Sequence, residues 1–239
     1  VYLEEGRRLR VIAVDKTEGV KETAKLVSEA GGTAEAVMAD AGNEADVKAF
    51  IDRAVAKYGK LDVIWANAGI SGGLVPLLEQ TVEQWQEILR VNLIGPFLAV
   101  KHAIPHMTRQ GSGAIVCTAS VAGLKAGASA HPYAASKAGV ISLVQTTAYS
   151  LSGTGVRINA VCPGLIETGM TKPIFDNAKS RGTDHKIGQL NPLKRAGQPH
   201  ELAAMGLFLA SDEASYVNGQ AFPVDGGLTA SMPYAGKPA

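Results

Sequence analysis

The sequence predicts an α/β fold in which a doubly wound parallel sheet is covered by helices on both faces. Short apolar or β-branched runs alternate with longer segments of helical periodicity, a pattern typical of parallel sheets. Several of these runs end in small or polar residues, as expected where the carboxyl ends of parallel strands form a ligand site. With 239 residues, 46% of them hydrophobic, the chain can bury one core, so we expect residues 1–239 to form a single domain.

The elements follow one another in a regular order. In chain order, the predicted strands are RVIAVD (10–15), TAEAVMAD (33–40), LDVIWANAG (61–69), GAIVCTAS (113–120), VRINAVCPG (156–164) and QAFPVDGG (220–227). The predicted helices lie at about 17–30, 43–58, 81–109, 132–152 and 199–210. Residues 169–198 are too long for an ordinary connection and are predicted to form a lid over a site. Trp65 and Trp85 are interpreted as packing residues.

Composition excludes several classes of function. The formal net charge of +1, without a block of like charges, argues against nucleic acid and membrane surfaces as partners. The first residues, VYLEEGRRLR, are too charged for a signal peptide. Cys117 and Cys162 lie in apolar stretches, which favours reduced thiols and a cytoplasmic location. His102 and His106 are one helical turn apart without a third ligand near them in sequence, so we expect no metal site.

Polar and small residues at the strand ends are candidate ligand contacts. Asp15 ends the first predicted strand, where a carboxylate can accept hydrogen bonds from both ribose hydroxyls of an adenine dinucleotide; the alternative is a cap for the following helix. Asp40 ends the next run, and it either bonds an adenine amino group or caps a helix. The stretch Asn67-Ala68-Gly69 either lets a ligand approach the backbone closely or forms a plain turn.

The segment HPYAASKAGV places Tyr133 and Lys137 four residues apart, on one face of a predicted helix. A free tyrosine has a pKa near 10, and a lysine cation one turn away favours the phenolate and lowers that pKa. The spacing therefore suits proton transfer. The alternative is a packed phenol beside a solvated lysine.

These motifs, in this order and at this spacing, resemble the short-chain dehydrogenase/reductase family over nearly the whole chain. Asn67-Ala68-Gly69 is similar to the family's N-A-G turn, and Asn92 in RVNLIGPF matches its helix asparagine. Ser120 precedes Tyr133 by thirteen residues, as the family's serine does, and Tyr133 with Lys137 fills its Y-x-x-x-K motif. The stretches NPLKRAGQPHELA and FLASDEASYVNGQAFPVDGG are also similar to the family's C-terminal third.

The resemblance implies a Rossmann-like fold and an oxidoreductase that interconverts a secondary alcohol and a ketone with a nicotinamide cofactor. Tyr133 would transfer the proton, and Ser120 would bond to the same oxygen atom. Lys137 would hold the nicotinamide ribose. Asn92 would hold a water beside Lys137, although it could instead satisfy backbone groups at a kink. The expected cofactor-binding residues are Asp15, Asp40, Ala41, Asn67, Ala68, Gly69, Tyr133, Lys137, Pro163, Gly164, Ile166 and Thr168.

The charge of Asp15 predicts NAD as the cofactor rather than NADP, because a carboxylate repels the 2′-phosphate of NADP. Lys16 is the complication, since a neighbouring cation can offset part of that repulsion.

One departure from the family concerns the start of the sequence. The family opens with a strand and a glycine-rich T-G-x-x-x-G-x-G loop whose amides hold the pyrophosphate at a helix N-terminus, and the sequence has neither. VYLEEGRR is similar to the tail of the helix that follows this loop. The absent strand would lie between residues 10–15 and 61–69, so its absence should leave two unpaired inner strand edges. We therefore expect the sequence to begin partway into a longer chain.

Alternatives remain open for function and substrate. The second functional hypothesis is a non-catalytic binding or scaffold protein that keeps the fold without the phosphate loop. Four basic residues and two acidic ones between Lys172 and Lys186 suggest an anionic substrate such as a carrier-bound 3-oxoacyl chain; sugars, polyols and cyclic alcohols are the other candidates.

Apolar residues on more than one face of two helices predict a symmetric homo-oligomer, a tetramer, as the resemblance also implies. These residues are Ile94, Phe97, Leu98, Ile104, Val140, Leu143 and Val144.

Overall fold

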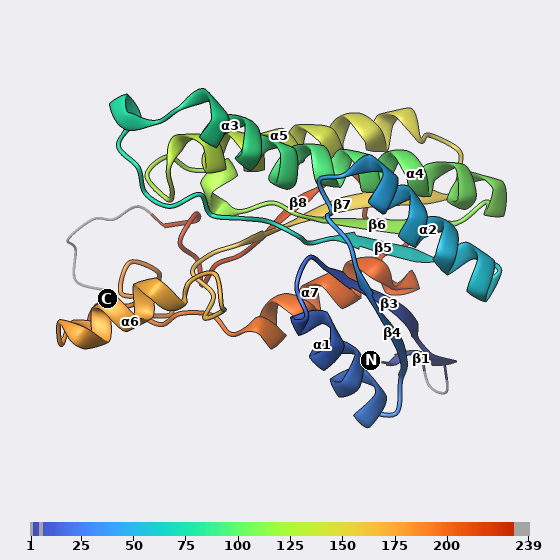
Figure 1. Cartoon of the computed structure of the whole chain (residues 1–239), viewed down its shortest axis with the longest axis horizontal. Helices are drawn as coiled ribbons and strands as arrows, with labels where there is room; N and C mark the ends of the chain where they lie inside the picture. Colours follow the sequence, from blue (N-terminus) through green and yellow to red (C-terminus); the bar gives the residue numbers. More distant parts are fainter. Residues whose placement is uncertain (1, 5–6, 232–239) are drawn as a thin grey trace.

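The computed structural model describes residues 2–4 and 7–231 and shows strands between two layers of helices (Figure 1). The strands are β1 (Tyr2–Glu4), β2 (Arg7–Arg8), β3 (Arg10–Asp15), β4 (Thr33–Met38), β5 (Val63–Ala66), β6 (Gly113–Thr118), β7 (Val156–Pro163) and β8 (Ala221–Val224). The helices are α1 (Gly19–Glu29), α2 (Glu44–Tyr58), α3 (Val82–Leu89), α4 (Gly95–Gln110), α5 (His131–Ser150), α6 (Lys172–Ser180) and α7 (Pro199–Ala210). The predicted alternation of strands and helices is confirmed.

Local sequence signals explain where the helices begin and end. The side chain of Asn43 caps α2 by accepting from Asp46 N at 3.2 Å, and α2 ends at Gly59, whose φ of 78° is left-handed. Thr81 and Gln84 form a reciprocal capping box at the start of α3. Pro199 stands in the first turn of α7, where a missing N–H costs nothing.

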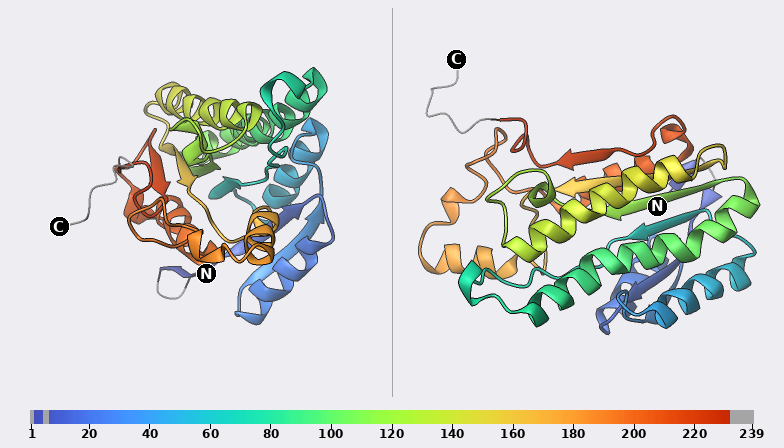
Figure 2. Two further views of the ribbon diagram at one scale, coloured as in Figure 1. Left: turned by 90° about the vertical axis from the view of Figure 1, so that its left-hand side faces the viewer. Right: turned by 90° about the horizontal axis from the view of Figure 1, so that it is seen from above.

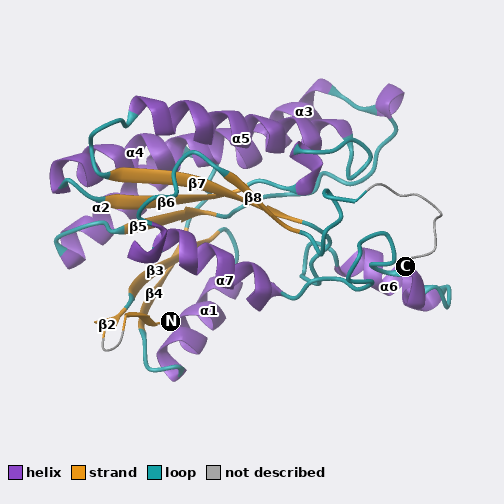
Figure 3. Ribbon diagram, turned by 180° about the vertical axis from the view of Figure 1, so that it is seen from behind, coloured by secondary structure: helices purple, strands orange, loops and turns teal. Residues whose placement is uncertain are grey.

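Strands β5, β6, β7 and β8 form a parallel sheet in that order, and among the described residues β3 pairs only with β4, in parallel. Helices α2, α4 and α5 cover one face of the strands, and α1 and α7 lie on the other (Figures 1 and 3). The larger core lies under the first group, where Ile115, Ile158 and Val144 are buried. A smaller one around Val161 and Leu209 lies under α7. Because both faces are covered, β7 is apolar and buried almost throughout.

A gap separates β3 from β5 within the part of the chain that the structure describes. Figure 3 shows the β3–β4 pair set apart from the four-stranded sheet. A cavity of about 1210 Å³ lies between the two facing edges and is lined mainly by apolar side chains of β3, β5, α2, α4 and α7. One end of the cavity reaches Asp15, Ala41, Asn67 and Ala68. The prediction of two unpaired inner edges is thus confirmed.

The segment before β3 differs from its prediction as the tail of a helix. Its described residues form two short strands, β1 and β2, that pair in antiparallel fashion. A helix of so few residues is unstable in isolation, because its nucleation cost is not recovered by propagation. The predicted helix at 81–109 is also interrupted, since residues Arg90–Ile94 adopt a π-helical turn between α3 and α4.

The predicted lid segment, 169–198, contains α6 and a short 3₁₀ turn at Asp184–Lys186. Together with the segment that links β5 to α3, it lies at the end of the molecule to which the strands of the larger sheet point (Figure 2). Among the residues described, no helix combines the length and apolar character needed to cross a membrane.

Candidate active site

Tyr133 and Lys137 lie in the first two turns of α5 and, as their spacing predicts, on the same face. The Lys137 Nζ atom is 5.7 Å from the centre of the Tyr133 ring and donates a 2.7 Å hydrogen bond to the Thr118 carbonyl oxygen at the end of β6. Lys137 is only 2% exposed, so its ammonium is held inside the protein beside the phenol. The alternative of a solvated lysine is wrong.

Burial dominates the protonation of this pair. It lowers the pKa of Lys137 to about 8, because desolvation disfavours the charged amine. It also raises the pKa of Tyr133 above its ordinary value, and the neighbouring Ser120 hydroxyl offsets only part of that rise. Without the cofactor, desolvation of the ring thus raises the phenol pKa. The predicted lowering relies on the positive charge of the oxidised nicotinamide as well as on Lys137, and it stays a prediction.

Ser120 follows β6 and begins a 3₁₀ turn, so its side chain lies at the carboxyl edge of the sheet. Its Oγ atom accepts a 3.1 Å hydrogen bond from Ala122 N, and the residue is buried. The neighbouring β7 ends at Pro163. The Ser120 hydroxyl is close enough to Tyr133 to affect the pKa of its phenol through a side-chain hydrogen bond, so both hydroxyls can face one ligand oxygen.

Asn92 lies in the π-helical turn and is fully buried. Its Oδ1 accepts from Ile70 N at 2.8 Å, and its Nδ2 donates to Ile70 O at 2.9 Å and to Ser136 Oγ at 3.3 Å. The side chain therefore satisfies backbone groups, as the alternative interpretation held, but these belong to Ile70 rather than to the kink itself. A Cβ at Gly69 would lie 3.3 Å from Asn92 Oδ1 and 3.6 Å from Lys137 Nζ, so the turn before Ile70 packs tightly on both residues.

A chain of side-chain hydrogen bonds orients Asn67. Trp65 Nε1 donates to Thr118 Oγ1 at 2.8 Å, and Thr118 Oγ1 donates to Asn67 Oδ1 at 2.9 Å. The interpretation of Trp65 as a packing residue was therefore incomplete. Sequence reasoning did not single out Thr118, although it stands in the strand-end stretch VCTAS. Ala68 lies beside Asn67 at the lining of the cavity.

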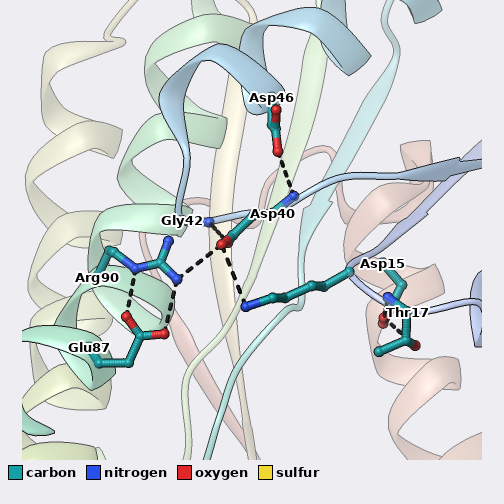
Figure 4. A network of polar contacts seen from close by, with 8 residues as sticks. Asp15, Thr17, Asp40, Gly42, Asp46, Glu87 and Arg90 are labelled. Atoms are coloured by element: carbon teal, nitrogen blue, oxygen red, sulfur yellow. Dashed lines mark hydrogen bonds and ion pairs between the residues drawn. The ribbon is translucent and has the colours of Figure 1, made fainter.

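Two acidic residues lie at the carboxyl ends of β3 and β4 (Figure 4). Asp15 Oδ1 accepts from Thr17 N at 2.7 Å and from Thr17 Oγ1 at 2.8 Å, so it stabilises the turn before α1. Asp40 Oδ1 accepts from Gly42 N at 2.8 Å, and Asp40 Oδ2 accepts from Arg90 at 3.0 Å. The helix-cap alternative for Asp40 is wrong, because Asn43 performs that role for α2.

The remaining predicted cofactor-binding residues, from Pro163 to Thr168, lie at the end of β7 and in the turn that follows it. Gly164 N donates to Val224 O at 3.0 Å, and a Cβ at Gly164 would lie 2.8 Å from Asp225 Cα, so a side chain at this position would collide with the backbone that follows β8. Ile166 is buried and forms an isolated bridge with Gly197. Thr168 is exposed and accessible to a ligand at the start of the lid segment.

The histidines and cysteines have ordinary surroundings. His102 Nε2 lies 3.0 Å from Glu44 Oε1, and His106 Nε2 lies 3.8 Å from Asp52 Oδ1. No cluster of three or more potential metal-binding side chains occurs within the described ranges 2–4 and 7–231. Cys117 and Cys162 are free and buried, and burial raises the pKa of their thiols to about 12 and about 11.

Comparison with known proteins identifies the family. A family model described as enoyl-(acyl carrier protein) reductase matches residues 2–229. The cis-4-hydroxycyclohexanecarboxylate dehydrogenase of Sinomonas cyclohexanicum is 39% identical over 224 residues, which cover 94% of this chain and 88% of that protein.

Solved structures of similar proteins support the same family assignment. The crystal structure of levodione reductase has a TM-score of 0.88 at 34% identity and covers 93% of this chain and 89% of its own. A gluconate 5-dehydrogenase from Burkholderia cenocepacia J2315, solved in complex with NADP and tartrate, has a TM-score of 0.84 at 32% identity over 92% of this chain and 86% of its own. The chain therefore belongs to the short-chain dehydrogenase/reductase family, and it is an oxidoreductase of the nicotinamide-dependent kind.

Proposed function

We propose that the protein interconverts a secondary alcohol and a ketone, with Tyr133 as the group that transfers the proton. The observation that carries this proposal is Lys137, a buried cation beside the phenol with a backbone carbonyl as its hydrogen-bond acceptor. Burying an ammonium costs several kcal/mol, a cost that suits a functional site better than a packing site.

The four side chains have complementary roles. When bound, the nicotinamide supplies or accepts the hydride. Tyr133, whose pKa is raised by burial, keeps its proton at neutral pH and can donate it to the carbonyl oxygen in reduction. Ser120 donates a hydrogen bond to the same oxygen, and Lys137 stabilises the phenolate left behind. Asn92 fixes the backbone at Ile70 and so holds the Asn67–Gly69 turn against Lys137.

The described residues fit the two ends of a nicotinamide dinucleotide. The bonds of Asp15 to Thr17 use its Oδ1 atom, so we propose that Oδ2 accepts from the adenosine ribose. Ala41 lines the same cavity as Asp15, and Asp40 directly precedes it in the chain. At the other end, the close packing of Gly69 on Lys137 leaves a backbone surface that a ribose can approach. The remaining proposed contacts come from Asn67, Ala68, Pro163, Gly164, Ile166 and Thr168.

We propose NAD as the preferred form of the cofactor. Lys16 Nζ lies 3.9 Å from Asp40 Oδ2, so the lysine already faces a carboxylate on the neighbouring strand end. A 2′-phosphate near Asp15 would have to compete for that cation and also face the Asp15 charge.

Exposed apolar side chains support an apolar substrate. Leu74, Leu77 and Leu78 follow β5, and Met170 and Ile174 follow β7; we call these five residues the apolar rim. Gln80 Nε2 lies 3.3 Å from His131 Nδ1, which places the first segment beside the start of α5 and Tyr133. In the lid, Lys172 is paired with Asp176 at 2.6 Å, which weakens the case for an anionic substrate. We propose a cyclic alcohol or ketone. The name of the Sinomonas relative supports the ring and the hydroxyl group, although the compound in that name also carries a carboxylate.

We further propose a cytoplasmic homotetramer. Free, buried thiols suit a reducing compartment, and Ile94 and Phe97 near the start of α4 expose apolar surface that a subunit contact would cover.

The test of this function uses the full chain. NADH is titrated while its fluorescence is followed, and cyclohexanone derivatives are then added and NADH oxidation is measured. Saturable binding followed by NADH consumption is expected. Binding without turnover of any ketone would favour the non-catalytic alternative, and a flat titration would contradict the cofactor assignment.

A further inference from the structure

Arg90 occupies an unusual position, with its guanidinium held by two carboxylates from different parts of the chain (Figure 4). Its Nη2 donates to Asp40 Oδ2 at 3.0 Å. Its Nε and Nη2 also donate to the two carboxylate oxygens of Glu87 at 2.7 and 3.0 Å. A planar fork held in this way has little freedom to move, so its direction toward Asp40 is fixed.

The backbone of the same residue is fixed as well. Arg90 begins the π-helical turn, and its carbonyl oxygen accepts the hydrogen bond from Gly95 N that closes the turn. Asn92 lies inside this turn and is fully buried. The guanidinium therefore extends from a rigid part of the molecule.

The loop that carries Asp40 packs directly on this turn. A Cβ at Gly95 would lie 2.9 Å from Ala41 O, and a Cβ at Gly42 would lie 3.2 Å from Arg90 O and overlap the guanidinium. Asp40 N also donates to Asp46 Oδ2 at 2.8 Å. The Arg90 guanidinium is the main reason that the pKa of Asp40 lies below its ordinary value. Arg90 and Gly42 N together therefore fix the direction of the Asp40 carboxylate, and Arg90 favours its charged form.

We propose that Arg90 is a positioning residue for cofactor recognition: it holds the Asp40 carboxylate in the orientation that accepts a hydrogen bond from the amino group of adenine. This inference rests on the proposed cofactor site. Its competitor is a structural brace that joins the loop to α3 without any influence on which base is recognised.

The two roles differ in their effect on base discrimination. The experiment measures dissociation constants by fluorescence for NADH and for reduced nicotinamide hypoxanthine dinucleotide, which carries an oxo group in place of the adenine amino group. In the wild type, NADH should bind about tenfold more tightly, because the analogue leaves the Asp40 carboxylate without its donor. In Arg90→Gln, the preference should fall below about twofold while the affinity for the analogue changes little.

Two further variants sharpen the result. Arg53→Gln removes an arginine of α2 that pairs with Glu35 instead, and it should keep the wild-type preference. Arg90→Lys keeps the charge but not the fork, so it should give an intermediate preference, and it serves as the test if Arg90→Gln does not fold.

Several results would overturn the inference. Equal weakening of both dinucleotides in Arg90→Gln would show a structural brace. An unchanged preference in both folded Arg90 variants, or a wild type that does not discriminate, would also refute the positioning role while leaving the proposed function intact. Failure of the wild type to bind either dinucleotide would refute both the inference and the proposed function.

Discussion

Lys137 shows most directly how a single residue links stability to activity at this site. Its amine is buried next to Tyr133 and donates a hydrogen bond to the carbonyl oxygen of Thr118. Burial lowers its pKa to about 8, well below the ordinary value of 10.5. At neutral pH the buried charge therefore lowers the stability of the folded protein, and an apolar side chain at this position would not have this effect.

This cost predicts a pH-dependent difference in stability between the wild type and Lys137→Met. Between about pH 8 and 10.5 the unfolded chain binds the lysine proton and the folded protein does not, so the wild type gains stability as pH rises. Lys137→Met lacks this gain. Its free energy of unfolding should exceed that of the wild type by up to about 3 kcal/mol at pH 7, and the excess should shrink across that window.

Urea denaturation at several pH values measures the effect, with Lys125→Met as the exposed control. A difference between the wild type and Lys137→Met that does not vary with pH would contradict the assignment of a buried, charged lysine.

Asp15 governs the second prediction at this scale, which concerns the choice of cofactor. The specificity constant kcat/KM should be at least about tenfold higher with NAD than with NADP, because the carboxylate faces the 2′-phosphate. Asp15→Ala should narrow the preference. Steady-state kinetics with both cofactors measures the two specificity constants. A higher constant for NADP would overturn the assignment of NAD. An unchanged preference in Asp15→Ala would show that Asp15 only stabilises the turn with Thr17.

At the scale of elements, the site is built where β6 ends, where α5 begins and where the π-helical turn interrupts a long helix. The strands and helices could be predicted because hydrophobic periodicity and caps are local signals, as at Asn43 and Gly59. The contact of Arg90 with Asp40 could not be predicted from the sequence, since the two residues are 50 positions apart and their pairing depends on packing. The sequence did not predict the π-helical turn either, and the tight packing of Gly95 on Ala41 beside it joins segments far apart in the chain.

The two segments that carry the apolar rim predict how substrate binding responds to mutation. In Leu78→Ser and Ile174→Ser, the KM for a cyclic ketone should rise about fivefold each, with little change in kcat, because each removes apolar surface that the substrate covers. Leu26→Ser, on α1, changes an apolar side chain about as exposed as Ile174 but outside the rim, and it should have no effect. Larger effects of both rim variants on a charged substrate than on the ketone would contradict the apolar assignment.

At the scale of the whole molecule, the sheet is divided between the β3–β4 pair and the four-stranded sheet. The position of the gap could be predicted because the family resemblance placed a strand between residues 10–15 and 61–69. The sequence did not predict the cavity of about 1210 Å³ that this gap leaves, because its lining comes from helices of both layers. The face expected to form subunit contacts is also smaller than predicted, because Leu98, Val140 and Val144 are buried within the subunit.

The remaining exposed apolar residues of that face predict the assembly. Sedimentation at micromolar concentration should show a tetramer with twofold symmetry, and Phe97→Glu should shift it toward smaller species, since a charge would be buried in the contact. Leu26→Glu, on α1, is the matched control. If the wild type sediments as a monomer, the predicted tetramer is wrong. If Phe97→Glu still forms a tetramer, the subunit contact does not involve Phe97.

The central claim is that Tyr133 transfers the proton, and the variant Tyr133→Phe tests it most directly because it removes a single oxygen atom. Turnover of a ketone with NADH is compared in the wild type, in Tyr133→Phe and in Tyr149→Phe, which alters an exposed tyrosine on the same helix. We expect kcat to fall at least about a hundredfold in Tyr133→Phe, although NADH still binds, and to stay at the wild-type level in Tyr149→Phe. A Tyr133→Phe enzyme that keeps more than about a tenth of the wild-type rate would contradict the account.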